Sequence, residues 1–81
     1  MTRNQINVYL ASILTTIAET DEAPSGIIYS ALMANFVTLN EYMQLQTILV
    51  SSELCTLSHD VLRLTDRGHE LANEINKIKA A

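Results

Sequence analysis

Two apolar segments with helical spacing lie only three residues apart, and this closeness limits the possible folds more than any other feature of the sequence. The first runs roughly from Pro24 to Asn35 and the second from Leu39 to about Ser52, so only Phe36, Val37 and Thr38 separate them. Two helices joined by so short a connection have to pack against each other at a steep angle and behave as one bihelical unit.

The first helix of this unit opens on the only proline of the chain, and proline is well suited to the first turn of a helix. Ile28, Leu32 and Phe36 follow one another at four-residue steps and predict one buried stripe. Met33 lies beside this stripe and is expected to fill the core. Because Asn35 can adopt the left-handed conformation, we expect the helix to end there.

The second helix begins at a capping box, since Thr38 is followed three residues later by Glu41. Its apolar residues are expected to face the core fully or in part, and they are Leu39, Tyr42, Met43, Leu45, Leu49 and Val50. Its polar residues predict the outer face of the helix, and they are Asn40, Glu41, Gln44, Thr47 and Ser51.

Two more helices and a hairpin complete the chain. Asn4 to Glu19 has apolar residues at three- and four-residue steps and predicts a helix, and a last helix follows Thr65, a good N-cap. After the helix that ends near Ser52 and before Thr65, Leu54–Leu57 and Val61–Leu64 have strand character, and the residues Ser58–Asp60 suit a turn. Residues 1–81 are therefore expected to form one domain, mainly α-helical: three helices, a two-stranded hairpin and a C-terminal helix.

The junction between the hairpin and the last helix carries the most specific motif. Residues 62–72, LRLTDRGHELA, resemble the L-x-L-T-x-x-G-x-x-L sequence that follows the wing in MarR-like and PadR-like winged-helix regulators. The resemblance implies a winged helix-turn-helix fold, with the hairpin as its wing. It also implies the function of these families, which are mostly dimeric transcription regulators with the third helix in the DNA major groove.

The resemblance implies six DNA-binding residues in the third helix and the wing: Asn40, Gln44, Thr47, Ser51, His59 and Arg63. Asparagine and glutamine can form two hydrogen bonds with adenine, and threonine can contact base edges or a thymine methyl group. The alternative is that the helical residues are only the solvated face of an amphipathic helix, and the pattern fits both interpretations equally.

The charge of the chain keeps a second function open. Five Lys and Arg against nine Asp and Glu give a net charge of −4. Between Thr38 and Thr65 the acidic residues are Glu41, Glu53 and Asp60 and the only basic one is Arg63, so this segment carries 1 − 3 = −2. Phosphate contacts supply most non-specific affinity for DNA. The alternative is a protein–protein interaction module whose acidic surface binds a basic or hydrophobic partner and no DNA.

No catalytic site, metal or cofactor is expected. Cys55 and His59 lack the further ligands that zinc needs, and Cys55 is expected to be a small buried hydrophobe on a strand. Ser58, His59 and Asp60 are consecutive and would not converge as a catalytic triad. With only two glycines, the chain has no glycine-rich phosphate loop. The sequence therefore favours a binding protein over an enzyme.

An unusually apolar composition, 48% of all residues, favours association of the chain with itself. We expect a homodimer formed through the first and last helices, and the residues are Tyr9, Ile13, Leu71, Ile75 and Ile78. The first residues lack the basic region and long apolar stretch of a signal peptide, and a single cysteine suits a reducing compartment. The expected location is the cytoplasm.

Overall fold

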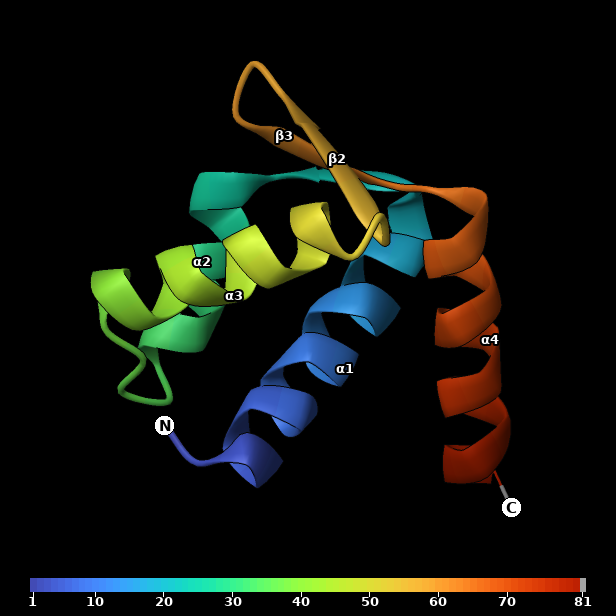
Figure 1. The fold of residues 1–81 in the computed structure, drawn as a ribbon, viewed down its shortest axis with the longest axis horizontal. Coiled ribbons are helices and arrows are strands. Elements are labelled where there is room, and N and C mark those ends of the chain that lie inside the picture. The colour runs from blue at the N-terminus through green and yellow to red at the C-terminus, as the bar shows by residue number, and fades with distance from the viewer. Residues whose placement is uncertain (81) are drawn as a thin grey trace.

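The computed structural model describes residues 1–80, and these form four helices and a three-stranded antiparallel sheet. The elements in chain order are α1 (Arg3–Thr20), β1 (Glu22–Pro24), α2 (Ser25–Met33), α3 (Leu39–Ser51), β2 (Cys55–Ser58), β3 (Val61–Leu64) and α4 (Asp66–Ala80). Figure 1 shows α2 and α3 at one end, the sheet above α1, and α4 on the other side. The predicted mainly helical fold with a hairpin and a C-terminal helix is confirmed.

A third strand, β1, joins the expected two-stranded hairpin. It pairs with β3, which places Glu22 opposite Arg63 and Pro24 opposite Val61 and makes β3 the central strand. Three residues that end on a proline give no alternating pattern from which a strand could be predicted. Pro24 is tolerated because it ends an edge strand, where its missing N–H is not needed by the sheet.

The helix α3 begins as predicted. The Thr38 hydroxyl accepts a hydrogen bond from the Glu41 N–H at 3.2 Å, and the Glu41 carboxylate accepts one from the Thr38 N–H at 2.9 Å. These bonds to Thr38 lower the pKa of the Glu41 carboxyl group. Thr2 and Gln5 make the same reciprocal arrangement at the start of α1, so α1 and α3 both begin at a capping box.

The turn between α2 and α3 differs from the prediction. Helix α2 ends at Met33, and the left-handed backbone (φ 64°) belongs to Phe36, not to Asn35. Phe36 is 92% exposed, and Val37 after it is buried and continues the core stripe in its place. The predicted burial of Phe36 and Met33 is wrong, since Met33 is also 54% exposed. The short turn rotates the chain, so the four-residue spacing of the stripe does not extend through it.

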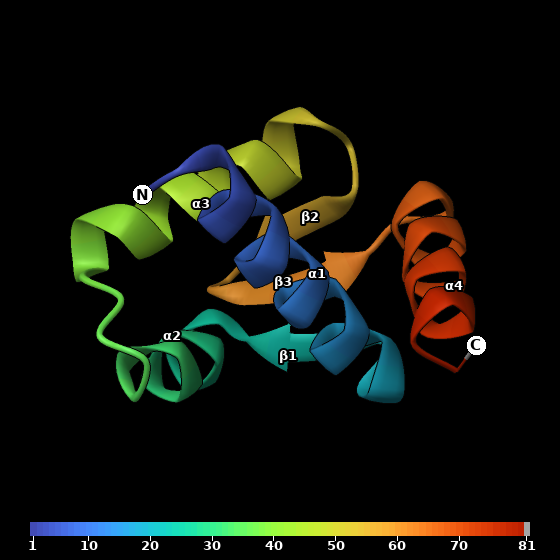
Figure 2. The same cartoon turned by 90° about the horizontal axis from the view of Figure 1, so that it is seen from below.

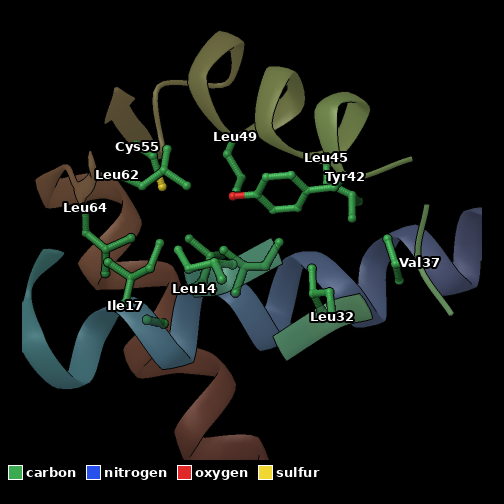
Figure 3. Packing of buried hydrophobic residues seen from close by; sticks show 13 residues of the cluster. Leu14, Ile17, Leu32, Val37, Tyr42, Leu45, Leu49, Cys55, Leu62 and Leu64 are labelled. Atoms are coloured by element: carbon green, nitrogen blue, oxygen red, sulfur yellow. The ribbon is translucent and has the colours of Figure 1, made fainter. Parts of the chain in front are cut away.

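The core lies where α1, α2, α3 and the inner face of the sheet meet, as Figure 3 shows. Helix α3 contributes one narrow stripe, Tyr42, Leu45 and Leu49, all at most 2% exposed. The Tyr42 hydroxyl is satisfied by Ser25, whose Oγ lies 2.8 Å away. Three other α3 residues that were predicted to face inward fully or in part lie outside this stripe and are only partly covered: Leu39, Met43 and Val50 are 55%, 48% and 38% exposed.

The junction of the wing with α4 is densely bonded. The Thr65 hydroxyl donates to the Glu53 carbonyl at 2.6 Å and accepts from the Gly68 N–H at 3.1 Å, so Thr65 caps α4 as predicted. A Cβ atom on Gly68 would lie only 2.1 Å from the Leu54 carbonyl oxygen. The T-x-x-G part of the motif therefore serves the fold, because it closes the wing against the first turn of α4.

The wing itself closes with a two-residue turn. His59 and Asp60 both have positive φ, 51° and 61°, as a type I′ hairpin turn requires. The Asp60 carbonyl accepts a hydrogen bond from the Ser25 N–H at 2.8 Å, which ties the tip to the start of α2. At the base, Cys55 is 1% exposed, and burial raises the pKa of its thiol to about 11. The prediction that Cys55 is a buried strand residue is confirmed.

Candidate nucleic-acid interface

The exposed side of α3 divides into two edges. At 3.6 residues per turn, three polar side chains fall within about 40° of one another and form the polar edge: Asn40, Gln44 and Ser51. Three apolar side chains fall within a similar arc of about 40° and form the apolar edge: Leu39, Met43 and Val50. Thr47 lies between the two edges. The sequence pattern did not predict the apolar edge, because it placed Leu39, Met43 and Val50 on the core side of the helix.

The polar edge is open to an external partner. All of its residues are exposed, and the Asn40 and Gln44 side-chain amides make no hydrogen bond within residues 1–80. The hydroxyls of Thr47 and Ser51 donate to the backbone carbonyls of Met43 and Ile48, at 2.8 and 3.3 Å, and their oxygens can still accept. The predicted α3 residues therefore lie together on one solvent-facing surface.

The two predicted wing residues lie apart from this surface. His59 and Arg63 line a hollow of about 480 Å³ on the wing, together with Glu22, Thr56, Ser58 and Val61. Arg63 donates from Nε to a Glu22 carboxylate oxygen at 3.0 Å and from a second guanidinium nitrogen to the same oxygen. The structure therefore separates His59 and Arg63 from the polar edge, and the charge of Arg63 is already compensated by β1.

A different part of the wing meets α3. A hollow of about 270 Å³ is lined by residues of α3 and by Leu57 of β2, and its α3 residues are Gln46, Thr47, Val50 and Ser51. Leu57 is 39% exposed, like Val50 beside it. The C-terminal half of the exposed side of α3 and the near face of the wing thus form one continuous surface.

Arg67 is a basic residue that the site prediction left out. It lines a hollow of about 680 Å³ together with Val50 of α3 and Leu57 of the wing, and it makes no ion pair within residues 1–80. The sequence feature that could have indicated Arg67 is its position in the L-x-L-T-x-x-G motif, directly after the wing. Unlike Arg63, Arg67 forms no ion pair within residues 1–80, although the carboxylates of Glu53 and Asp66 line the same hollow.

A family model described as "Winged helix-turn-helix" matches residues 2–81. The chain belongs to this family. The two edges lie on α3, the second helix of its helix-turn-helix, and β2 and β3 are its wing (Figure 2). No curated protein and no solved structure is similar enough to count as a match. The winged-helix resemblance is thus confirmed, and the narrower likeness to MarR-like and PadR-like regulators stays a prediction.

Winged helix-turn-helix domains typically act by binding DNA and not by catalysis. Within residues 1–80, no group of three or more His, Cys, Asp or Glu side chains is arranged to hold a metal ion. No helix in the same part of the chain combines the length and apolar character that crossing a bilayer requires.

The residues expected to form a dimer are mostly used inside the domain. Ile13 is 1% exposed and belongs to the core, so its predicted place at a dimer surface is wrong. Tyr9, Leu71 and Ile75 are half-buried and pack against the same core. Ile78 alone of the five is widely exposed, at 75%. The outer side of α1 and α4 therefore offers less apolar surface than the sequence pattern suggested.

Proposed function

We propose that this winged helix-turn-helix protein is a transcription regulator that binds duplex DNA, with the polar edge of α3 in the major groove and the wing beside it. The observation that carries the proposal is the pair of exposed, unbonded amides of Asn40 and Gln44, one helical turn apart on the helix that this fold presents to DNA.

The chemistry of the polar edge favours A·T base pairs. Asparagine and glutamine amides match the N6 and N7 positions of adenine with two hydrogen bonds each. Thr47, between the edges, offers a methyl group and a hydroxyl to a neighbouring thymine, and Ser51 can reach a base edge or a phosphate. Contacts of this kind carry sequence information without any charge on the protein.

Charge contributes little to this binding. Helices α2 and α3 contain no Lys or Arg, and Arg63 is engaged with Glu22. If each chain neutralises one or two phosphates, through Arg67 and a released Arg63, the logarithm of the binding constant falls with the logarithm of salt concentration at a slope of only about −1 to −2. Specific base contacts therefore supply most of the affinity.

Selection from a pool of random duplexes at low salt, followed by fluorescence anisotropy on the enriched sequence, tests the proposal. We expect Asn40→Ala and Gln44→Ala each to weaken binding about tenfold or more, since a good bidentate base contact contributes about 1–3 kcal/mol. Asn73→Ala, an exposed change on α4, is the matched control and leaves the affinity unchanged. Absence of enrichment, or equal losses for all three variants, contradicts the proposal.

Glu22→Gln tests the electrostatic part separately. The change removes one negative charge and releases Arg63, so we expect a several-fold gain in affinity and a salt slope steeper by about 1. Arg63→Gln in the same background removes the gain. An unchanged slope would mean that Arg63 does not reach the phosphates.

A second candidate function is a protein-interaction module, which the uncharged and apolar edge of α3 and the net charge of −4 favour. In that case Leu39→Ser reduces capture of a basic or hydrophobic partner, whereas Asn40→Ala does not. The DNA proposal requires the reverse order of effects on duplex binding.

Pairing of two chains through the outer side of α1 and α4 stays a prediction. It would use Tyr9, Leu71, Ile75 and Ile78, and sedimentation velocity of Ile78→Ser against the unchanged protein measures it. As a DNA-binding protein with a single reduced cysteine, the chain is proposed to work in the cytoplasm.

A further inference from the structure

Five large apolar side chains on α3, in the turn before it and on the wing beside it are exposed and have no part in the proposed DNA contact. Phe36, just before the helix, is 92% exposed, and the apolar edge of Leu39, Met43 and Val50 follows it. Leu57 of the wing, 39% exposed, ends the series. Single exposed apolar residues are ordinary on a protein surface, whereas several on and beside one helix indicate an interaction surface.

The two ends of this series have opposite shapes. From Leu39 to Val50 the helix rises about 16 Å, at 1.5 Å per residue, and Met43 lies near the middle of the series. One end carries the exposed ring of Phe36. The other end is the hollow of about 270 Å³ that Val50 and Leu57 line. A surface with an anchor at one end and an apolar hollow at the other is complementary to itself after a twofold rotation.

We propose that a second copy of this chain docks on the apolar edge of α3, with the two α3 helices antiparallel and each Phe36 in the Val50–Leu57 hollow of the other copy. In this arrangement the two Met43 side chains meet near the twofold axis. The interface is isologous, so it closes as a dimer and does not propagate.

Charge selects a second copy as the occupant. Each copy carries −4, so two copies repel each other at long range. The segments 25–40 and 42–52 contain no charged residue, and Glu41 between them lies 3.9 Å from the positively charged amino group of Met1. The apolar edge is therefore a surface through which two acidic copies can approach without like charges meeting at its centre.

The size of the surface also fits. An aromatic side chain can bury about 150–250 Å² and Phe36 is almost fully exposed, so together with the four half-exposed side chains the patch reaches on the order of 500 Å². A standard interface buries about 800 Å² per partner, of which slightly more than half is apolar. A single copy therefore already exposes about as much apolar area as one partner contributes to a standard interface.

The backbone of Phe36 gives a further reason. A left-handed conformation costs a non-glycine residue roughly 1–2 kcal/mol, and a Phe at this position gains nothing inside its own domain. Burial of the ring in another copy would offset that cost. Because the apolar edge adjoins the polar edge on the same helix, the dimer also covers α3 against duplex DNA, and this consequence rests on the proposed function.

Sedimentation velocity over a series from micromolar to millimolar protein tests the dimer. We expect reversible association of the unchanged protein, and a rise of about tenfold or more in its dissociation constant for Phe36→Asn. Asparagine tolerates the left-handed backbone, so the variant keeps the turn while it removes the ring. Ile27→Ser, which also removes an exposed apolar side chain but on α2, is the matched control and associates as the unchanged protein does. A monomer at all concentrations overturns the proposal, and so does a dimer that Ile78→Ser dissociates and Phe36→Asn does not.

Cysteine cross-linking tests the antiparallel arrangement. In a Cys55→Ala background, Met43→Cys is expected to form a disulfide-linked dimer under mild oxidation, while Val8→Cys, exposed on α1, forms none. Equal cross-linking of the two variants overturns the arrangement. Phe36→Asn is further expected to bind the enriched duplex more tightly at high protein concentration. If neither form binds any duplex, the DNA-binding function fails while the dimer result stands on its own.

Discussion

Two connections in this small domain are built in opposite ways. The junction from wing to α4 is closed by hydrogen bonds of Thr65 to Glu53 and Gly68 and is so tight that Gly68 has no room for a Cβ atom. The turn from α2 to α3 instead leaves Phe36 in a left-handed backbone with its ring in solvent. The first connection stabilises the fold, whereas the second places an exposed aromatic ring on an unfavourable backbone conformation, which lowers stability and gives the monomer no contact in return.

The largest expected effect is at the tight junction. Gly68→Ala forces a methyl group against the Leu54 carbonyl oxygen, and we expect a loss of about 3 kcal/mol or more in the free energy of unfolding. For a domain of this size that corresponds to a fall of well over about 10 °C in Tm. Gly26→Ala is the matched control, because its Cβ would meet nothing within 4 Å, and it leaves Tm unchanged or higher.

Alkaline pH weakens the same junction. Cys55 lies opposite Leu64 at the base of the wing, and burial raises its pKa from an ordinary value of 9.0 to about 11. Below pH 9 the thiol is protonated in both the folded and the unfolded protein, and its contribution to the free energy of unfolding is fully present. This contribution is lost as the pH rises from 9 through about 11, because the unfolded protein then ionises its thiol more readily than the folded one. We expect a loss of about 2–3 kcal/mol across this range. Urea unfolding as a function of pH measures it, and Cys55→Ala should flatten that part of the profile.

Loss of the N-cap of α4 ranks third. Thr65→Ala removes the bond to the Gly68 N–H and leaves the Glu53 carbonyl without its partner. The expected cost is about 1–2 kcal/mol in the free energy of unfolding, measured by urea denaturation. Thr16→Ala, whose hydroxyl only bonds the carbonyl four residues before it within α1, should cost much less. Equal costs for the two changes would show that the cap has no special weight.

The smallest effect, with the opposite sign, is expected at the open turn. Phe36→Gly relieves the left-handed strain, so we expect the monomer to gain up to about 1 kcal/mol or to keep its stability. Thermal unfolding at low protein concentration measures this. A clear loss of stability would mean that the Phe36 ring contributes to the monomer, and the contrast between the two connections would then fail.

The parts of the fold that the sequence predicts are those whose partners are near in the chain. Thr38 and Glu41, and Thr65 and Gly68, are each three residues apart, so their caps follow from local spacing. The strand β1 does not, because its partner β3 lies about forty residues away and nothing in the residues Glu22–Pro24 points to it. Local hydrogen bonding is visible in a sequence, whereas long-range pairing depends on the assembled core.

The candidate site follows the same division. The exposure of Asn40 and Gln44 could be predicted from helical periodicity alone. The engagement of Arg63 by Glu22 could not, because it requires β1 beside β3. Nor could the periodicity show that Tyr42, Leu45 and Leu49 suffice to fill the contact with the core, which left the apolar edge of α3 in solvent.

The hydrogen bond from the Ser25 N–H to the Asp60 carbonyl determines how the wing can move. It joins the tip of the hairpin to the first residue of α2, directly after β1, which pairs with β3 along the same side of the hairpin. The wing is therefore held along β3 up to its tip and cannot swing as a free arm. If duplex DNA lies across α3 as proposed, the wing adapts little to it, and we then expect affinity to depend on how easily the duplex deforms as well as on its base edges.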